Sequence, residues 1–174
     1  MNGVKDLPDI VALMDTYWIV SSSGKEFLEE NAPNQCEFIP TEVWRNKKSA
    51  SRRSETSPDV QIEKDYFWLN IVRRFDAIAW DQSQARLYEF DGEDWDTKEK
   101  KRVKRVKFPD HPTHSHLKGC GLTIRKDVIG DSQIWRDNFS GAGFVGLTFM
   151  SDDLKLKIER NKLGRIFFIP VKEV

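Results

Sequence analysis

Aromatic and β-branched residues in this sequence come in short runs bounded by polar and glycine-containing stretches. Such runs are typical of β-strands, whereas a helix needs a longer segment with apolar residues three and four positions apart. We therefore expect a chain that is mainly sheet. The predicted strands are Thr16 to Ser21, Glu37 to Trp44, Tyr66 to Arg73, Phe75 to Ala79, Ala85 to Phe90, Gly121 to Arg125, Gln133 to Asp137, Gly143 to Phe149 and Arg165 to Val171.

Two segments have the apolar spacing of a helix, Gly24 to Asn31 and Ser151 to Asn161. In the second, Leu154 and Ile158 fall four residues apart on one helical face. Together with the strands, these helices predict an α+β fold in which two short helices pack on a mostly antiparallel, twisted sheet. A hairpin from about Ala85 to Lys107 is expected to project from that sheet.

The two helical segments are similar in sequence at a constant offset of 130 residues. Ser21 to Pro40 aligns without gaps on Ser151 to Pro170, with seven identities in twenty positions. Each copy would bury the apolar face of its helix on a strand pair, and its final proline would end the ladder because it has no N–H. We predict two strand–helix–strand units, about residues 17–43 and 144–174, within a single domain of residues 1–174.

The composition fits one soluble domain, with 174 residues, 39% hydrophobic and 28 basic against 28 acidic side chains. This length can bury a core without disulfides, and the two cysteines, Cys36 and Cys120, fit a reducing compartment. No apolar run approaches the ~20 residues that cross a bilayer, so we expect a cytoplasmic protein without membrane contact. A net charge of zero argues against a dedicated nucleic-acid binder. The Ser-, Lys- and Arg-rich segment 45–59 is predicted to be a mobile loop.

Several segments resemble a family of bacterial immunity proteins from polymorphic toxin systems, immunity family eleven, formerly a domain of unknown function. The shared motifs are the helix start Ser151 to Lys155, the strand Phe168 to Val171, and the run from Asp76 to Ser83. The resemblance implies a protein without enzymatic activity or cofactor that binds and neutralises a cognate toxin. Arg86 to Gly119 lies outside the resemblance, and partner specificity could sit there. The matching segments are Tyr17 to Val43, Tyr66 to Ser83 and Ile134 to Val171.

An acidic tract from Tyr88 to Asp96 is the strongest candidate contact surface in the sequence. An inhibitor of a nucleic-acid-degrading toxin can place carboxylates where phosphates would lie, while aromatic side chains, Trp95 above all, anchor the contact. Alternatively, Asp91-Gly92 is the two-residue turn of a solvated hairpin tip. The predicted partner-binding residues are Tyr88, Glu89, Asp91, Glu93, Asp94, Trp95 and Asp96.

A basic run follows from Lys98 to Lys107, with seven basic residues and a single acid among ten. It could bind phosphates, form an exposed edge strand or a helix face, or neutralise the acidic tract through cross-strand pairs.

The competing function class is a metal-dependent enzyme or a nucleic-acid-associated protein. It rests on a histidine cluster and on the basic runs, because imidazole and thiolate are good zinc ligands. The cluster's spacing matches none of the common zinc motifs, so a polar loop is the alternative, and metal analysis of the purified protein separates the two. Asp76, beside an apolar run, would cap backbone N–H groups if buried. The candidate metal ligands are His111, His114, His116 and Cys120.

Six tryptophans are many for this length, and most are predicted to lie in the core. The strand around Trp68 is apolar on both faces, which indicates a central strand. Trp95 is the one expected near the surface.

Overall fold

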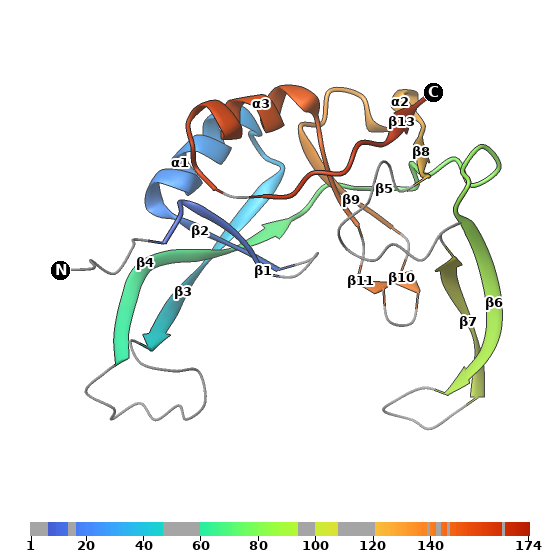
Figure 1. The fold of residues 1–174 in the computed structure, drawn as a ribbon, viewed down its shortest axis with the longest axis horizontal. Helices are drawn as coiled ribbons and strands as arrows, with labels where there is room; N and C mark the ends of the chain where they lie inside the picture. The colour runs from blue at the N-terminus through green and yellow to red at the C-terminus, as the bar shows by residue number, and fades with distance from the viewer. Residues whose placement is uncertain are drawn as a thin grey trace. The chain divides into compact units, whose positions relative to one another are not determined.

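The computed structural model describes residues 7–13, 17–46, 60–93, 100–107, 121–138, 140–141, 144–145, 147–164 and 166–174. These residues divide between two compact units (Figure 1). Unit 1 comprises Met1–Val72 and Asp152–Ile166, and unit 2 comprises Arg73–Ser151 and Phe167–Val174. The fold is α+β, as predicted, with more strands than helices among the described elements.

Unit 1 contains a four-stranded antiparallel sheet with the strand order β1-β2-β4-β3. The strand around Trp68 is therefore central, as the sequence predicts. The longest strand pair is β3 and β4: β3 extends into the start of the segment 45–59, and β4 begins directly after that segment, before its predicted start at Tyr66. Residues 47–59 lie outside the described ranges. The strands are β1 (Ile10–Leu13), β2 (Tyr17–Ser21), β3 (Cys36–Asn46) and β4 (Val60–Ile71).

Helix α1 (Ser22–Asn31) covers one face of this sheet. Ser21 caps it, because the hydroxyl oxygen accepts a hydrogen bond from the backbone N–H of Gly24 at 3.1 Å. Lys25 lies over two aromatic rings of the sheet, with its Nζ 4.9 Å from the centre of Phe67 and 5.7 Å from that of Phe38. The methylene stem of a lysine covers apolar surface in such an arrangement while its charge reaches water.

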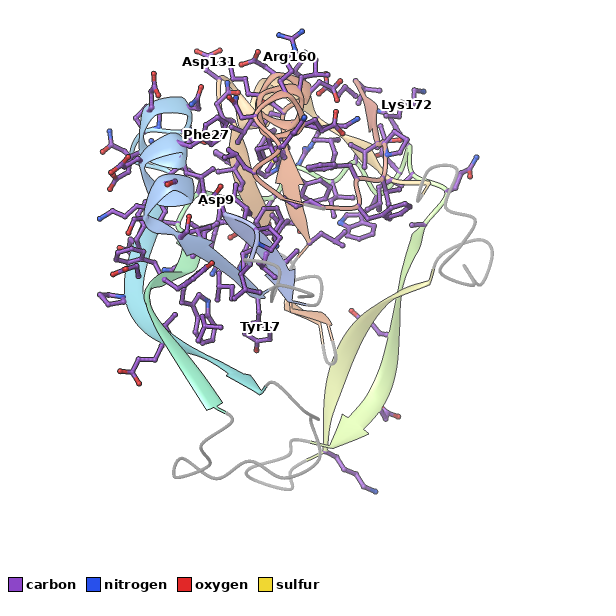
Figure 2. The ribbon with its side chains drawn as sticks, turned by 60° about the vertical axis from the view of Figure 1, so that its left-hand side comes forward. Asp9, Tyr17, Phe27, Asp131, Arg160 and Lys172 are labelled. Atoms are coloured by element: carbon purple, nitrogen blue, oxygen red, sulfur yellow. The ribbon has the colours of Figure 1, made fainter. Side chains whose placement is uncertain are left out.

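The backbone at Asp9, which is labelled in Figure 2, and at Ile10 joins segments of unit 1 that are distant in the sequence. The Asp9 carbonyl accepts from the N–H of Ser21 at 2.8 Å, and the N–H of Ile10 donates to the carbonyl of Leu163 at 2.8 Å. The approach is so close that a Cβ at Gly24 or Gly164 would collide with the backbone carbonyl of Asp9 or Ile10, respectively. Both positions therefore need glycine for space.

Helix α3 (Asp152–Arg160) belongs to unit 1 and lies on the same side of the sheet as α1 (Figure 1). Its buried residues, Leu154 and Ile158, stand 130 positions after the buried Gly24 and Leu28 of α1. The helical halves of the predicted repeat thus bury equivalent positions.

The strand that should complete the second copy of the repeat is absent. Residues 166–171 belong to no strand, so the structure does not show a repeated strand–helix–strand unit. Pairing starts only beyond Pro170, where the backbone N–H of Lys172 donates to the carbonyl of Leu122 at 3.1 Å. The prediction that each copy's proline ends the ladder is wrong for the first copy, because Pro40 lies inside β3 opposite Phe67 and the strand continues to Asn46. Phe167, in the predicted strand, is 74% exposed.

Unit 2 contains several separate sheets of two or three strands rather than one large sheet. Its apolar cluster includes Ala77, Ile124, Trp135 and Phe149, and the last two rings stack with their centroids 5.7 Å apart. Two pairings are parallel, β5 with β9 and β13 with β8, and the others are antiparallel. The elements are β5 (Arg74–Phe75), β6 (Arg86–Glu93), β7 (Lys100–Lys107), β8 (Thr123–Ile124), α2 (Lys126–Ile129), β9 (Ile134–Asp137), β10 (Ser140–Gly141), β11 (Phe144–Val145), β12 (Thr148–Met150) and β13 (Lys172–Glu173).

The crowding at Gly24 predicts an unusual response to alanine. In a helix, Gly→Ala normally stabilises by about 0.5–1 kcal/mol, but the Asp9 carbonyl occupies the space that the new Cβ needs. We expect Gly24→Ala to lower the free energy of unfolding by about 1–3 kcal/mol, measured by chemical denaturation. Ser23→Ala, one position earlier on the exposed side of α1, is the control and should be neutral or slightly stabilising. An increase in stability for Gly24→Ala would contradict the close approach.

Candidate functional site

The predicted hairpin exists, but its turn is not where the sequence indicates. β6 and β7 pair antiparallel over eight residues each, from Arg86 opposite Lys107 to Glu93 opposite Lys100. Asp91 and Gly92, the predicted turn, lie within β6 opposite Arg102 and Lys101. The turn prediction is wrong because the basic run continues the ladder as a strand past these two residues. The alternative interpretation of the basic run as a helix face is also wrong, because Lys100–Lys107 form the strand β7.

The register of the hairpin matches acids with bases. Glu89 stands opposite Lys104, Asp91 opposite Arg102, and Glu93 opposite Lys100. Opposite charges directly across an antiparallel pair stabilise the hairpin modestly. The side chains of Glu89, Asp91 and Lys100 are exposed. Three of the five predicted carboxylates therefore have a base at the opposite register position, as the cross-strand interpretation of the basic run expects.

The remaining predicted residues lie outside the described ranges. These are the end of the acidic tract, Asp94, Trp95 and Asp96, and all four candidate metal ligands, His111, His114, His116 and Cys120. Within the part of the chain that the structure describes, no group of three or more His, Cys, Asp or Glu residues could hold a metal ion.

The run from Asp76 to Ser83 has a structural role. Asp76 is exposed, so the condition under which its side chain would cap backbone N–H groups is not met. Its backbone carbonyl oxygen accepts a hydrogen bond from the Arg125 guanidinium. Ser83 connects two segments, because its hydroxyl donates to the carbonyl of Ala79 at 2.7 Å and accepts from the N–H of Thr123 at 3.0 Å. This motif holds the core of unit 2 in place.

A partly exposed apolar row crosses the sheet of unit 1 on the face opposite α1, with Val11 and Ile19 half-buried. The register aligns Val11 with Ile19, Ile19 with Trp68, and Trp68 with Ile39, which places one residue of each strand in the row. Trp68 is 43% exposed and Ile39 is 52% exposed. We call these four residues the outer row.

Tyr17 extends the outer row towards the start of β2 (Figure 2). Its ring is 41% exposed and meets Trp68 edge to face, with the centroids 5.2 Å apart and the planes at 78°. This geometry is favourable for aromatic pairs. Exposed Trp and Tyr side chains are also the types that dominate protein interfaces. A partner with an apolar surface could cover this row.

The sequence did not identify Trp68 as a surface residue. Trp18 and Trp135 are buried, at 5% and 3% exposed, as expected of core tryptophans. Trp68 alternates with buried Leu69 along β4, and a strand that is apolar on both faces gives no signal of which face a helix covers. Sequence reasoning also missed the burial of two charged residues of β9, Arg136 and Asp137.

The described residues thus include two surfaces that a partner could contact, the β6–β7 hairpin and the outer row. The model of the immunity protein family Imm11 matches residues 2–173, nearly the whole chain. The chain belongs to this immunity protein family. The match includes Arg86 to Gly119, which extends the likeness beyond the segments recognised in the sequence.

Family membership has a direct functional meaning. Immunity proteins neutralise a cognate toxin and are generally not enzymes, so a toxin is the partner that this family implies. No curated protein and no solved structure matches this chain. Across the described ranges, no helix has the length and apolar character needed to span a membrane.

The two tryptophans of neighbouring strands should differ in their effect on stability. Trp18 is 5% exposed and Trp68 is 43% exposed, and the loss on truncation grows with the buried area removed. We expect Trp18→Ala to cost about 3–5 kcal/mol of unfolding free energy and Trp68→Ala at most about 2 kcal/mol, measured in urea. Equal losses would mean that Trp68 is buried in solution.

Proposed function

We propose that this protein binds its cognate toxin directly and neutralises it by covering a surface that the toxin needs. The β6–β7 hairpin makes the contact. Family membership supports the toxin as partner, and the hairpin is the element that a partner would complete.

The observation that carries the proposal is that the hairpin forms a sheet of its own. Among the described strands, β6 and β7 pair only with each other, and β7 contacts β10 without joining it in a ladder. A hairpin that no further strand supports is marginally stable in water. A ribbon of eight residue pairs, with Glu89, Asp91 and Lys100 exposed, gains order when a partner packs on it.

The acidic tract Tyr88 to Asp96 remains the proposed contact segment, with Trp95 as its anchor. Trp is the residue type that most often dominates binding energy, and it does so when a partner removes it from water. Three acids of the tract stand opposite bases, so the proposal assigns the largest part of the binding energy to Trp95 and to its acidic neighbours Asp94 and Asp96.

The outer row is the second surface that a toxin could cover. Its exposed apolar residues are centred on Trp68, in the four-stranded sheet of unit 1. Because Trp68 and Trp95 lie in different segments, single variants separate the two surfaces.

The test is co-expression with the toxin encoded by the adjacent gene, scored by rescue of growth and by co-purification. We expect the double variant Asp94→Lys/Trp95→Ala to fail in both, because loss of an anchor costs about 2 kcal/mol or more, roughly a 30-fold rise in Kd. Phe167→Ala is the matched control, since it also removes an exposed aromatic ring, 74% exposed, outside both surfaces.

Each outcome has a definite meaning. Rescue by the Phe167→Ala and Trp68→Ala proteins, with failure of the Asp94→Lys/Trp95→Ala protein, supports the hairpin as the contact. Failure of Trp68→Ala, with full rescue by the hairpin variant, moves the contact to the outer row. Absence of a complex with the wild-type protein, when the toxin is active alone, refutes direct binding.

A further inference from the structure

The register of the hairpin separates its charges between the two faces of the ribbon. Successive residues of a strand belong to opposite faces, and directly opposed residues share a face. The pairing from Arg86 to Glu93 contains no bulge, so this assignment runs unbroken along the hairpin. One face has the pairs Leu87/Val106, Glu89/Lys104, Asp91/Arg102 and Glu93/Lys100, and the other has Arg86/Lys107, Tyr88/Arg105, Phe90/Val103 and Gly92/Lys101.

The first face, which we call the paired face, has three acids and three bases and is neutral overall. The second, which we call the cationic face, has four basic positions and no acid, together with two aromatic positions, Tyr88 and Phe90. In this register the acids and bases of the paired face cancel in net charge, whereas the cationic face has a net positive charge. The acidic tract and the basic run therefore do not simply cancel each other.

We propose that the cationic face binds an acidic surface of the cognate toxin, with the aromatic positions at the centre of the contact. This inference rests on the proposed function, because it assigns the face of the hairpin and the charge of the partner. Opposite charges across an interface accelerate encounter and reject wrong partners. Arginine and tyrosine are enriched in the contacts that dominate interfaces, and both occur on this face.

The acids of β6 then act within the hairpin. Each of the three acids stands opposite a base, and this favours the observed register of β6 and β7 over other registers. In this register the remaining bases are placed on the cationic face. The acids of β6 thereby specify the register, while Arg86, Lys101, Arg105 and Lys107 supply a second set of contacts beside those proposed for Trp95, Asp94 and Asp96.

A protein partner fits this face better than a nucleic acid. The whole chain has 28 basic and 28 acidic residues, without the excess of positive charge typical of nucleic-acid-binding domains. Family membership implies a toxin partner. The four basic positions of this face would attract an acidic partner, because a surface of one sign of charge raises the association rate of a partner of opposite sign.

Two matched double variants of β7 test the assignment. Lys101→Gln/Arg105→Gln neutralises two bases of the cationic face, and Arg102→Gln/Lys104→Gln neutralises one Lys and one Arg of the paired face. Both remove the same charge from the same strand. The probe is the toxin encoded by the adjacent gene, inactivated by substitution, and the readout is the association rate constant at low and high salt. Circular dichroism checks that each variant is folded.

We expect Lys101→Gln/Arg105→Gln to slow association at low salt by about tenfold and to weaken its salt dependence. Arg102→Gln/Lys104→Gln should change the rate by no more than about twofold at low salt. Equal effects of the two variants on a complex that the wild-type protein forms would overturn the face assignment and leave the proposed function intact.

Faster association of Arg102→Gln/Lys104→Gln, with no loss for the other pair, would show that the acids are the recognition groups. A single-stranded oligonucleotide provides a further arm. If Lys101→Gln/Arg105→Gln weakens binding of the oligonucleotide and leaves association with the toxin unchanged, the cationic face binds nucleic acid instead of the toxin. Failure of the wild-type protein to bind the toxin would instead refute the proposed function itself.

Discussion

The backbone contact at Asp9 and Ile10 is the constraint on which unit 1 depends. It joins the start of α1 to the turn that follows α3, because the Ser21 N–H donates to the Asp9 carbonyl and the Ile10 N–H donates to the Leu163 carbonyl. The approach tolerates no Cβ at Gly24 or Gly164. Because the two helices come from opposite ends of the chain, this contact brings together segments that no local sequence preference could connect. The sheet then has one face covered by α1 and one that exposes the outer row.

The hairpin of unit 2 has a different pattern, in which acidic and basic residues stand at opposed register positions. Its acids and bases are sorted by register into a neutral face and a positive face. A core element would be expected to contribute apolar surface at alternate positions, but this ribbon is charged on both faces. This arrangement of charges suits a protein whose family implies one cognate partner. A pattern of charges distinguishes partners more sharply than apolar area does.

Much of the fold could be predicted from local patterns. The α+β class, the central position of the Trp68 strand, the burial of Leu154 and Ile158, and the hairpin all follow from periodicity and composition. The errors share one cause, which is that pairing is not a local property. Asp91-Gly92 has the composition of a turn but continues a strand, because bases are available opposite it. Residues 166–171 have the composition of a strand but form none.

The sequence by itself determined the family, the element types and the segment in which charged residues are concentrated, because these depend on residue identity and spacing. Only the tertiary structure decided which face of β4 is exposed, which bases stand opposite acids, and where glycine is required for space. Each of these depends on the neighbour that another part of the chain supplies. Trp68 and Arg105 are the clearest cases: the first is half exposed because α1 covers the other face, and the second is on the positive face because the register places it opposite Tyr88.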